Sequence, residues 1–399
     1  MKIRVAVFFG GQSCEHEVSC ISANQVIQAL NKDKYEVIPV YIAKNKDMYT
    51  GDLLFDLANY TDLNDLVSKL RKVSLVKDGN HVYLHAVKDS LFKHYEQEID
   101  VAFPVMHGTG GEDGTLQGLL EMMDLPYTSS SVIGSAVGQD KIIMKEILEY
   151  HHIPIVPWFQ IKVSEFENRQ QEYLEKARAL GFPLIVKPAN LGSSIGIEVI
   201  HNEEEFADKV REAGKYDFKL AVESMVKDLK EVNCSVIGSL KEAKTSAIEE
   251  VMKDDAFLTF DKKYLGGSKS AKTKGAVKAP AKGGASKGMA SASRKVPADL
   301  DPATEEEIRN YALRSFEALE AHGCVRIDFM IDRADGKVYV NEINSIPGSL
   351  AFYLWQETGM GFDKECDLLI DNALKRKSER EKKVFSFDTN ILQSYGRKK

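Results

Sequence analysis

The sequence predicts an α/β fold in the first third of the chain and an α+β fold in the second half, on two observations. Up to about residue 150, short apolar runs alternate with stretches of helical period, as in a layer with parallel strands. Beyond residue 180, pairs of strand-like runs are joined by short turns rich in Gly, Ser or Asp, which indicates hairpins. At roughly 100–200 residues per domain, the 399 residues allow about two to four domains.

The elements of the first third follow from apolar runs and periodicity. Apolar runs predict strands at residues 3–9, 36–42 and 99–106. Apolar residues at helical spacing predict helices at about residues 15–30, 113–123 and 140–151. Pro39 lacks an N–H donor, so it predicts an edge position or a bulge for the strand that contains it.

The second half predicts hairpins and one long helix. Strands are predicted at residues 183–187, 195–200, 231–237, 324–331 and 337–344. A Gly/Ser loop joins the first two of these strands, and an Asp335-Gly336 turn joins the last two. Thr304 and Glu307 have the spacing of a capping box, at the start of a helical stripe that continues to Leu319.

Composition excludes several classes of protein. The net charge of −7 and the pI near 5.8 disfavour a globally basic nucleic-acid binder. No apolar run approaches the roughly 18–20 residues that span a bilayer, and the apolar start is too short for a signal peptide. The five cysteines are scattered without CxxC spacing, which predicts neither a zinc site nor a disulfide framework. A reducing cytoplasm is therefore the expected compartment.

One segment differs from the rest in composition. Residues 262–298 contain ten basic residues and no acidic one, and the remainder is mostly Gly, Ala and Ser. Such a segment cannot bury enough apolar surface for a core element, so it is predicted to be a loop. The stretch 375–399 is also rich in Lys and Arg and is predicted to be a helix end with a tail.

The last hairpin predicts a metal site. Arg326 and Asp328 share one face of their strand, and Glu342 and Asn344 share a face of the next. The turn places Asp328 opposite Glu342, and two facing carboxylates repel each other. A divalent cation between them removes that repulsion, and carboxylate and amide oxygens are ligands of Mg²⁺. The alternative is a solvated face of an exposed hairpin.

Two glycine-rich stretches could hold phosphate. The loop ANLGSSIG follows Lys187, and its small residues let backbone N–H groups approach an anion closely. HGTGGEDGTLQG lies between a strand and a helix N-terminus, where N–H donors and the helix dipole favour negative charge. Asp140-Lys141 would add a cation, and Glu15 begins the first helix after Gly10-Gly11. Each of these is also explained by a tight turn, a surface lysine or helix capping.

Five ordered blocks give the whole pattern a resemblance. These blocks are GGQSCEHEVS, HGTGGEDGTLQG, LIVKPANLGSSIG, RIDFMID and NEINSIPG. From about residue 3 to residue 375, the chain resembles the D-alanine–D-alanine ligase family, a branch of the ATP-grasp enzymes. The resemblance implies an ATP-grasp fold with an N-terminal Rossmann-like (preATP-grasp) α/β domain. It also implies boundaries at 1–130, 131–222 and 223–375, followed by a tail, 376–399.

The resemblance implies an activity as well. ATP would phosphorylate the carboxylate of one D-alanine, and the amine of a second D-alanine would attack the acyl phosphate. The products would be the D-Ala–D-Ala dipeptide for peptidoglycan synthesis, ADP and phosphate. This implies ATP and two Mg²⁺ ions, with Mn²⁺ as a substitute, in a cytoplasmic homodimer that binds neither nucleic acid nor membrane.

The resemblance implies a role for individual residues within these motifs. Nucleotide contacts would come from Lys141, Lys187, Ser193, Ser194, Glu223, Met225, Val226, Glu231, Phe257 and Lys263. Glu15 and His107 would meet the first substrate, with Ser193 and Tyr264 joining Glu15 in a network that closes the site. Arg326 and the Gly348 N–H would stabilise the oxyanion of the tetrahedral intermediate, and Asp328, Glu342 and Asn344 would bind the metal.

Two departures from the family leave alternatives open. The basic segment makes the active-site loop longer than in related ligases, either to strengthen nucleotide capture or as an insert without a role. Six residues beyond Pro347, where the family usually has a serine at the carboxylate site of the second substrate, this chain has Tyr353. The second substrate could therefore be D-serine, D-lactate or another amino acid. A non-catalytic ATP-binding regulator is a further alternative.

Overall fold

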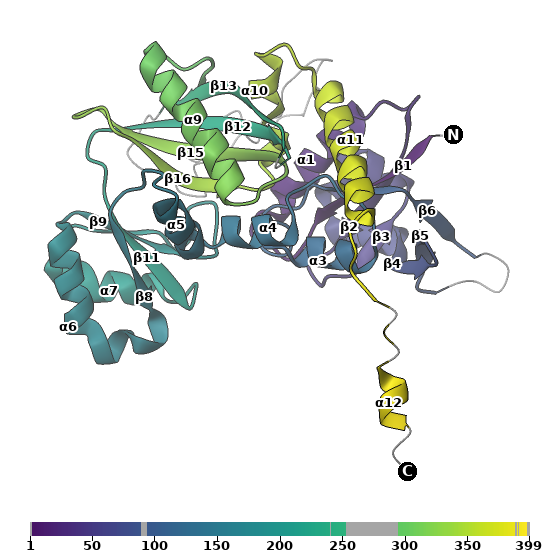
Figure 1. Cartoon of the computed structure of the whole chain (residues 1–399), viewed down its shortest axis with the longest axis horizontal. Coiled ribbons are helices and arrows are strands. Elements are labelled where there is room, and N and C mark those ends of the chain that lie inside the picture. Colours follow the sequence, from purple (N-terminus) through teal and green to yellow (C-terminus); the bar gives the residue numbers. More distant parts are fainter. Residues whose placement is uncertain are drawn as a thin grey trace, which may run out of the picture.

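The computed structural model describes residues 2–88, 94–239, 241–252, 294–387, 389 and 391–396. Within these ranges the strands form three β-sheets (Figure 1). The first sheet belongs to the N-terminal part of the chain, and the other two contain the strands from β8 onward. This mixed α/β architecture agrees with the fold class that the sequence predicts, whereas the boundaries near residues 130 and 222 stay a prediction.

The first sheet has seven strands in the order β6-β5-β4-β3-β2-β1-β7. The strands are β1 (Ile3–Gly10), β2 (Tyr35–Ile42), β3 (Met48–Thr50), β4 (Arg71–Asp78), β5 (His81–Ala86), β6 (Glu96–Ile99) and β7 (Val101–Pro104). β1 pairs in parallel with both β2 and β7, as predicted. The other pairs are antiparallel, and they extend the sheet beyond the parallel strands that the sequence predicts.

The position of Pro39 corrects one expectation. β2 is neither an edge strand nor bulged at Pro39, because β1 lies on one side of it and β3 on the other. The carbonyl of Pro39 accepts a hydrogen bond from Thr50 Oγ1 at 2.8 Å, so its nitrogen also faces β3. Since β3 pairs with β2 only through Tyr41 and Ile42, the missing N–H interrupts no ladder bond.

Helices cover both faces of the first sheet. In this part of the chain they are α1 (His16–Ala29), η1 (Asp52–Phe55), η2 (Leu57–Thr61), α2 (Leu63–Lys69) and α3 (Thr115–Met122). The next helix, α4 (Val132–Gln139), packs against α3 and against later parts of the chain. α1 buries Cys20, Ala23, Val26 and Ile27 in one core, and α3 buries Leu116 and Leu120 in another. The two helices therefore place the loops after β1 and β7 at one edge of the sheet.

The second sheet is antiparallel, in the order β10-β9-β11-β8. It consists of β8 (Trp158–Lys162), β9 (Leu184–Pro188), β10 (Glu198–Ile200) and β11 (Lys219–Ser224), with α5 (Lys141–Tyr150), α6 (Val163–Leu180) and α7 (Glu203–Ala213). α6 and α7 bury Phe166, Tyr173 and Phe206 against these strands in a core of their own. The loop between β9 and β10 is the predicted Gly/Ser loop.

The third sheet is antiparallel, in the order β14-β13-β12-β15-β16. Its elements are β12 (Leu229–Gly238), β13 (Ala243–Val251), β14 (Arg294–Lys295), α9 (Pro302–Ala318), β15 (Gly323–Asp332) and β16 (Val338–Asn344). α9 covers one face, where Val232, Ile327 and Phe329 pack with Ile308 and Phe316. Because side chains alternate along a strand, polar residues such as Asn233 and Asp328 occupy the opposite face.

The start of α9 corrects another expectation. Asp301, not Thr304, is the N-cap: its Oδ1 accepts hydrogen bonds from the N–H groups of Ala303 and Thr304. Thr304 Oγ1 donates to Asp301 Oδ2 at 2.6 Å instead of capping the helix itself. Pro302 is favoured in the first turn of a helix, so the helix begins there rather than after Thr304.

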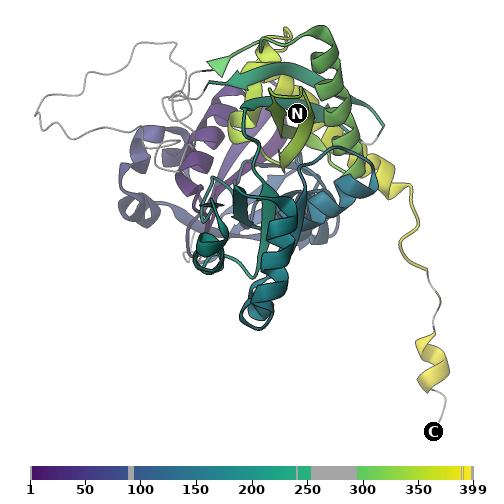
Figure 2. The same ribbon diagram turned by 90° about the vertical axis from the view of Figure 1, so that its left-hand side faces the viewer.

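The C-terminal elements return to the N-terminal sheet. They are η3 (Gly348–Ala351), α10 (Phe352–Gln356), α11 (Phe362–Glu381) and α12 (Leu392–Gly396). α11 and Trp355 share one apolar core with β1, α1 and β7, so the two ends of the chain pack together. α12 lies away from the body in both views (Figures 1 and 2).

All five cysteines are free thiols, and four of them are buried, which leaves Cys14 exposed. In the described part of the chain, no helix is both long enough and apolar enough to cross a bilayer.

Candidate active site

Four polar side chains lie in a row across the third sheet, on the face away from α9. The strand register pairs Glu249 with Asn233, Asn233 with Asp328, and Asp328 with Glu342. The predicted opposition of Asp328 and Glu342 is therefore confirmed. Carboxylates on adjacent strands repel each other, so this row favours bound cations.

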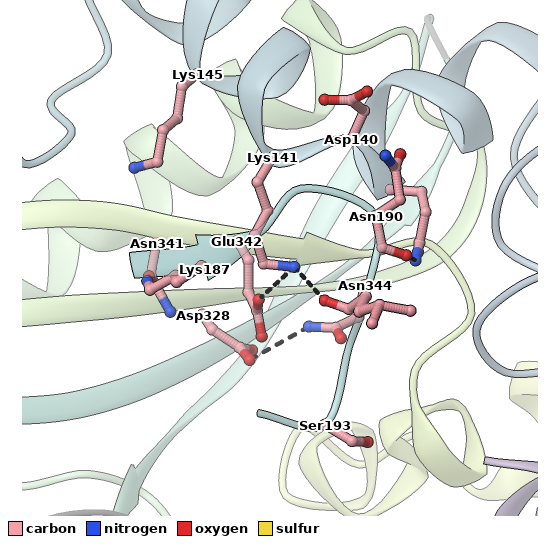
Figure 3. A network of polar contacts seen from close by, with 12 residues as sticks. Asp140, Lys141, Lys145, Lys187, Asn190, Ser193, Asp328, Asn341, Glu342 and Asn344 are labelled. Carbon is pink, nitrogen blue, oxygen red and sulfur yellow. Dashed lines mark hydrogen bonds and ion pairs between the residues drawn. The ribbon is translucent and has the colours of Figure 1, made fainter. Parts of the chain in front are cut away.

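A β-bulge in β16 adds a further polar group. The register passes from Asp328–Glu342 to Phe329–Val340, which leaves Asn341 as the extra residue. Bulges re-aim side chains and are frequent beside active sites. Asn341 Oδ1 accepts a hydrogen bond from Lys187 Nζ at 3.0 Å, and Glu342 Oε2 lies 3.6 Å from Lys141 Nζ (Figure 3). Two consecutive side chains thus reach two different lysines.

Arg326 binds Asp328 along the same strand. Its Nε and Nη2 donate to the two carboxylate oxygens at 2.6 and 2.8 Å. Asn344 Nδ2 donates to Asp328 Oδ2 at 3.2 Å, which completes a cluster of three predicted residues. Burial acts to lower the pKa of Arg326, but the charge of Asp328 outweighs it and keeps that pKa well above its usual value.

A buried cluster of charges lies behind Lys187. Glu223, which is 1% exposed, accepts a hydrogen bond from Lys187 at 2.7 Å and lies 3.2 Å from Lys145 Nζ. Burial acts to raise the pKa of Glu223, but the two ammonium groups lower it to about 2. Burial lowers the pKa of Lys145. Glu223 therefore neutralises two cations in the interior.

The loop between β9 and β10 reaches the N-terminal part of the chain. Ser193 Oγ donates to Glu15 Oε1, as the resemblance implies. A Cβ added at Gly108, where φ is +69°, would lie 3.0 Å from Glu15 Oε2, so glycine allows this close approach. Lys141 Nζ donates to the carbonyl of Leu191 in the same loop at 2.7 Å. Three segments far apart in sequence therefore converge here.

His107 is buried at the end of the strand that leads into its glycine-rich segment. It is 3% exposed, its Nδ1 lies 2.9 Å from the carbonyl of Ile346, and burial lowers its pKa. Glu112 accepts hydrogen bonds from the N–H groups of Gly108 at 2.8 Å and Ile346 at 2.9 Å. Burial raises the pKa of Glu112 to about 8. Both side chains tie the segment before Gly348 to the first sheet.

Tyr353 ends the polar row at β13. Its hydroxyl donates to Glu249 Oε1 at 2.8 Å, and Asn233 Nδ2 donates to the same oxygen at 2.9 Å. The Arg294 guanidinium lies 4.7 Å from the centre of the Tyr353 ring, in cation–π contact. Burial and the charge of Glu249 raise the pKa of the Tyr353 hydroxyl well above its usual value, although the charges of Arg326 and Arg294 act in the opposite direction.

Several predicted residues line one small pocket. Glu15, Lys141, Ser193, Glu342 and Asn344 line it together with Glu112 and Gln139. Glu231 lies on β12, and its negative charge adds to that of Glu223 in raising the pKa of Lys187. Val226 is buried against Val156 and Met330 in the connection before β12 and follows Met225, whose N–H donates to the carbonyl of Pro183. Ser194 has a φ of +59°, and Gly348 begins η3.

Some predictions lie outside the described residues. Phe257, Lys263 and Tyr264 are among them, as is the predicted loop 262–298 up to residue 293. Their roles stay predictions.

Sequence reasoning missed Lys145, Asn341, Glu112 and Glu249. Lys145 lies beside Met144 and one turn before Leu148 on the buried side of α5, and a lysine within an apolar stripe was the available signal. Glu112 lies inside the glycine-rich segment HGTGGEDGTLQG, but an acidic residue in such a loop is also explained by hydrogen bonds to the backbone of the turn. Asn341 gave no signal, because only the bulge turns it toward Lys187.

Two family models match the chain. One, described as the N-terminus of D-ala D-ala ligase, matches residues 4–130, and the other, described as its C-terminus, matches residues 147–371. Together they cover most of the chain. The chain belongs to the D-alanine–D-alanine ligase family. A D-alanine–D-alanine ligase of Thermosipho melanesiensis is 37% identical over 393 residues, which are 98% of each chain. One from Thermoanaerobacter sp. is 35% identical over 391 residues, which are 95% of this chain and 98% of that one.

Solved structures of the D-alanine–D-alanine ligase family have the same fold. The ligase from Coxiella burnetii aligns with a TM-score of 0.76 and 27% identity, over 99% of this chain and 98% of that one. The VanG D-Ala:D-Ser ligase from Enterococcus faecalis aligns with a TM-score of 0.74 and 25% identity, over 94% of this chain and all of that one. The ATP-grasp fold that the sequence resemblance implies is therefore confirmed.

D-alanine–D-alanine ligases use ATP and Mg²⁺, and the donor set fits the metal. Two carboxylates on adjacent strands and the amide of Asn344 are oxygen donors of the kind that Mg²⁺ accepts. Among the described residues, no group of three or more His, Cys, Asp or Glu could hold a metal. The cations Lys141, Lys187 and Arg326 surround this set, as an anionic nucleotide requires.

Proposed function

We propose that this protein is an ATP-dependent D-alanine–D-alanine ligase that makes the dipeptide for peptidoglycan synthesis. The observation that carries the proposal is the pair Asp328–Glu342 on adjacent strands, with Lys141, Lys187 and Arg326 beside it. Glu15 and Ser193 join the N-terminal part of the chain to the same pocket. Full-length similarity to curated D-alanine–D-alanine ligases supports the same substrates.

In the proposed first step, a carboxylate oxygen of one D-alanine attacks the terminal phosphorus of ATP, and ADP leaves. Asp328, Glu342 and Asn344 would hold Mg²⁺, which neutralises phosphate charge when bound. Lys141 and Lys187 add positive charge from the other side, and Glu231, Met225 and Val226 face the nucleotide. Glu15 receives the ammonium of this D-alanine beside His107. Alignment and charge neutralisation are the main requirements of phosphoryl transfer.

In the proposed second step, the neutral amine of the acceptor attacks the carbonyl carbon of the D-alanyl phosphate. The bond from that carbon to the phosphate oxygen breaks as the peptide bond forms, and the nitrogen gives up one proton, for which the departing phosphate is the available base. Arg326 and the N–H of Gly348 stabilise the oxyanion that develops on the carbonyl oxygen. The contact between Ser193 and Glu15 helps to exclude water, which would otherwise hydrolyse the acyl phosphate.

A different acceptor is a second candidate, because Tyr353 occupies the position where the family usually has a serine at the carboxylate site of the second substrate. Its hydroxyl is bound to Glu249, and its ring lies against Arg294. This is a bulkier and more strongly charged surrounding than a serine gives. D-Serine, D-lactate or another amino acid could therefore replace the second D-alanine.

Product analysis tests both candidates in one experiment. The enzyme is incubated with ATP, Mg²⁺ and D-alanine, alone and with each of a panel of D-amino and D-hydroxy acids. Phosphate release is measured, and the products are identified by mass spectrometry. We expect D-alanine-dependent phosphate release and D-Ala–D-Ala as the main product.

The other outcomes of this assay are equally informative. A mixed dipeptide or depsipeptide in preference to D-Ala–D-Ala would identify the second candidate. Nucleotide binding without turnover on any acid of the panel would refute the ligase assignment and favour a regulator. L-Alanine in place of D-alanine is the matched control and should give only the background rate.

We further propose that the protein acts in the cytoplasm as a homodimer. The free thiols of all five cysteines fit a reducing compartment. The dimer rests on the family resemblance alone. Size-exclusion chromatography with light scattering should give twice the chain mass of 44.6 kDa, and a mass of one chain at micromolar concentration would contradict it.

A further inference from the structure

Ser22 of α1 connects His107 to the backbone that follows Gly348. Ser22 Oγ lies 2.9 Å from His107 Nε2 and accepts a hydrogen bond from the N–H of Ser349 at 3.0 Å. Ser22 is 1% exposed, so water does not compete for these contacts. The three residues come from segments more than 80 positions apart in the chain.

The directions of these hydrogen bonds are fixed by chemistry. A carbonyl oxygen only accepts, so His107 Nδ1 donates to Ile346 and carries the ring proton. His107 Nε2 is then an acceptor in the neutral ring, the form that burial favours by lowering the pKa of His107. Ser22 Oγ accepts from Ser349, which leaves its own hydrogen for Nε2. In this one tautomer, each donor and each acceptor in the hydrogen-bond network from the Ile346 carbonyl to the Ser349 N–H therefore has a partner.

The backbone at the Ser349 end of this hydrogen-bond network is strained. Ser349, Leu350 and Ala351 have φ values of +52°, +54° and +53°, which is left-handed for three consecutive residues other than glycine. L-residues disfavour this conformation, so surrounding contacts must hold it. Ser22 binds the first of the three, and Cys324 Sγ donates to the carbonyl of Leu350 at 3.2 Å. The turn begins one residue after Gly348.

We propose that Ser22 is a positioning residue that sets His107 and the Gly348 turn as one unit. Through its hydrogen bond with Nε2, Ser22 orients the imidazole of His107 beside the first substrate. Through its hydrogen bond with Ser349, it holds the turn that directs the Gly348 N–H toward the oxyanion. This inference rests on the proposed function, because it assigns the two ends of the network to the first substrate and to the intermediate.

Replacement of Ser22 tests the proposal with a matched control. Ser22→Ala removes both contacts, and Ser22→Thr keeps the hydroxyl. Ser19→Ala is the control, since Ser19 lies on the same face of α1 and is fully buried. Among the described residues, its hydroxyl accepts from the Gly10 N–H and donates to the Val105 carbonyl, and it contacts neither His107 nor Ser349. The steady-state kcat and the KM for D-alanine are measured for each variant, with a thermal melt to confirm folding.

We expect Ser22→Ala to lower kcat/KM for D-alanine by about 10- to 100-fold, because misplaced groups lose alignment with the transition state. Ser22→Thr should recover most of that loss. Ser19→Ala should melt at a lower temperature yet keep kcat/KM within about threefold of the wild type, as a serine outside the network should. Near wild-type kinetics for Ser22→Ala, or an equal loss in Ser19→Ala, would overturn the proposal.

A spectroscopic readout separates this inference from the ligase assignment. The imidazole ¹⁵N resonances of His107 are assigned by comparison with His107→Gln in the protein without substrate. The wild type should show a proton on Nδ1 and a hydrogen-bonded Nε2, and the Nε2 signal should move in Ser22→Ala but not in Ser19→Ala. A proton on Nε2 in the wild type would refute the network even if the enzyme is active. Absence of ligase activity with the expected signals would refute the proposed function alone.

Discussion

Asp328→Asn and Glu342→Gln are each expected to lower kcat for D-alanine-dependent phosphate release by at least about 100-fold, because each removes one of the charged oxygen ligands that we propose for the metal. Both substitutions keep the size of the side chain, so the hairpin should still form. In Glu342→Gln, the Mg²⁺ concentration for half-maximal rate should rise. The measurement is a steady-state phosphate assay across a Mg²⁺ titration, with EDTA abolishing the rate.

Asp332→Asn provides the control for these two variants. Asp332 lies at the end of the same strand, and its carboxylate accepts from the N–H of Ala334 in the hairpin turn. Its loss should leave kcat unchanged, although it removes one negative charge from the same hairpin. Near wild-type turnover in Asp328→Asn or in Glu342→Gln would contradict the metal assignment.

Glu223→Gln is expected to destabilise the protein by about 3–5 kcal/mol, because it leaves two lysines in the interior without their counter-charge. Lys145 has no exposed surface, so it cannot turn outward to water. The measurement is the free energy of unfolding from urea titration, supported by thermal melts with and without ATP. Bound nucleotide should recover part of the loss, since ATP phosphates supply negative charge to Lys187.

Glu198→Gln is the matched control for this variant. Glu198 lies in the same sheet and pairs with Lys209 at 2.7 Å, but both side chains are about one-third exposed. Its loss should cost about 0–1 kcal/mol. Equal destabilisation by the two variants would show that burial of the Glu223 cluster has no special effect.

The stability of the protein in acid should depend on the same cluster of Glu223, Lys145 and Lys187. The pKa of Glu223 is lowered to about 2 in the folded protein, below its value in the unfolded chain. The stability that this carboxylate contributes is therefore present above about pH 4.5 and is lost as the pH falls toward 2. The wild type should lose more stability across this interval than Glu223→Gln.

The residues that could be predicted are those whose role depends on alternation and short turns. Asp328 and Glu342 face each other because side chains alternate along a strand and one turn fixes the register, and both facts are local. The loop after Lys187 could be predicted because its Gly and Ser residues favour a turn between two strands. In each case the chemistry required only neighbours in sequence, or neighbours across one hairpin.

The residues that could not be predicted depend on packing between distant segments. Glu249 joins the polar row only because β12 lies between β13 and β15. Ser22 meets Ser349 across 327 positions, and an ordinary serine on a helix carries no mark of that contact. The antiparallel strands β3–β6 and the true start of α9 were missed because tertiary pairing and a better cap overrode local patterns.

The separate apolar core of the second sheet has a consequence for how the enzyme takes up its nucleotide. In the described part of the chain, Phe166, Tyr173 and Phe206 pack with that sheet and its helices, whereas the two ends of the chain share another core. The second sheet is joined to its surroundings mainly by polar contacts, such as those of Lys187 with Asn341 and of Glu223 with Lys145, and by one small apolar cluster around Ile142. Separation of this sheet from the third should thus be less costly than unfolding, and amide exchange in residues 158–224 should slow as one block when ATP binds.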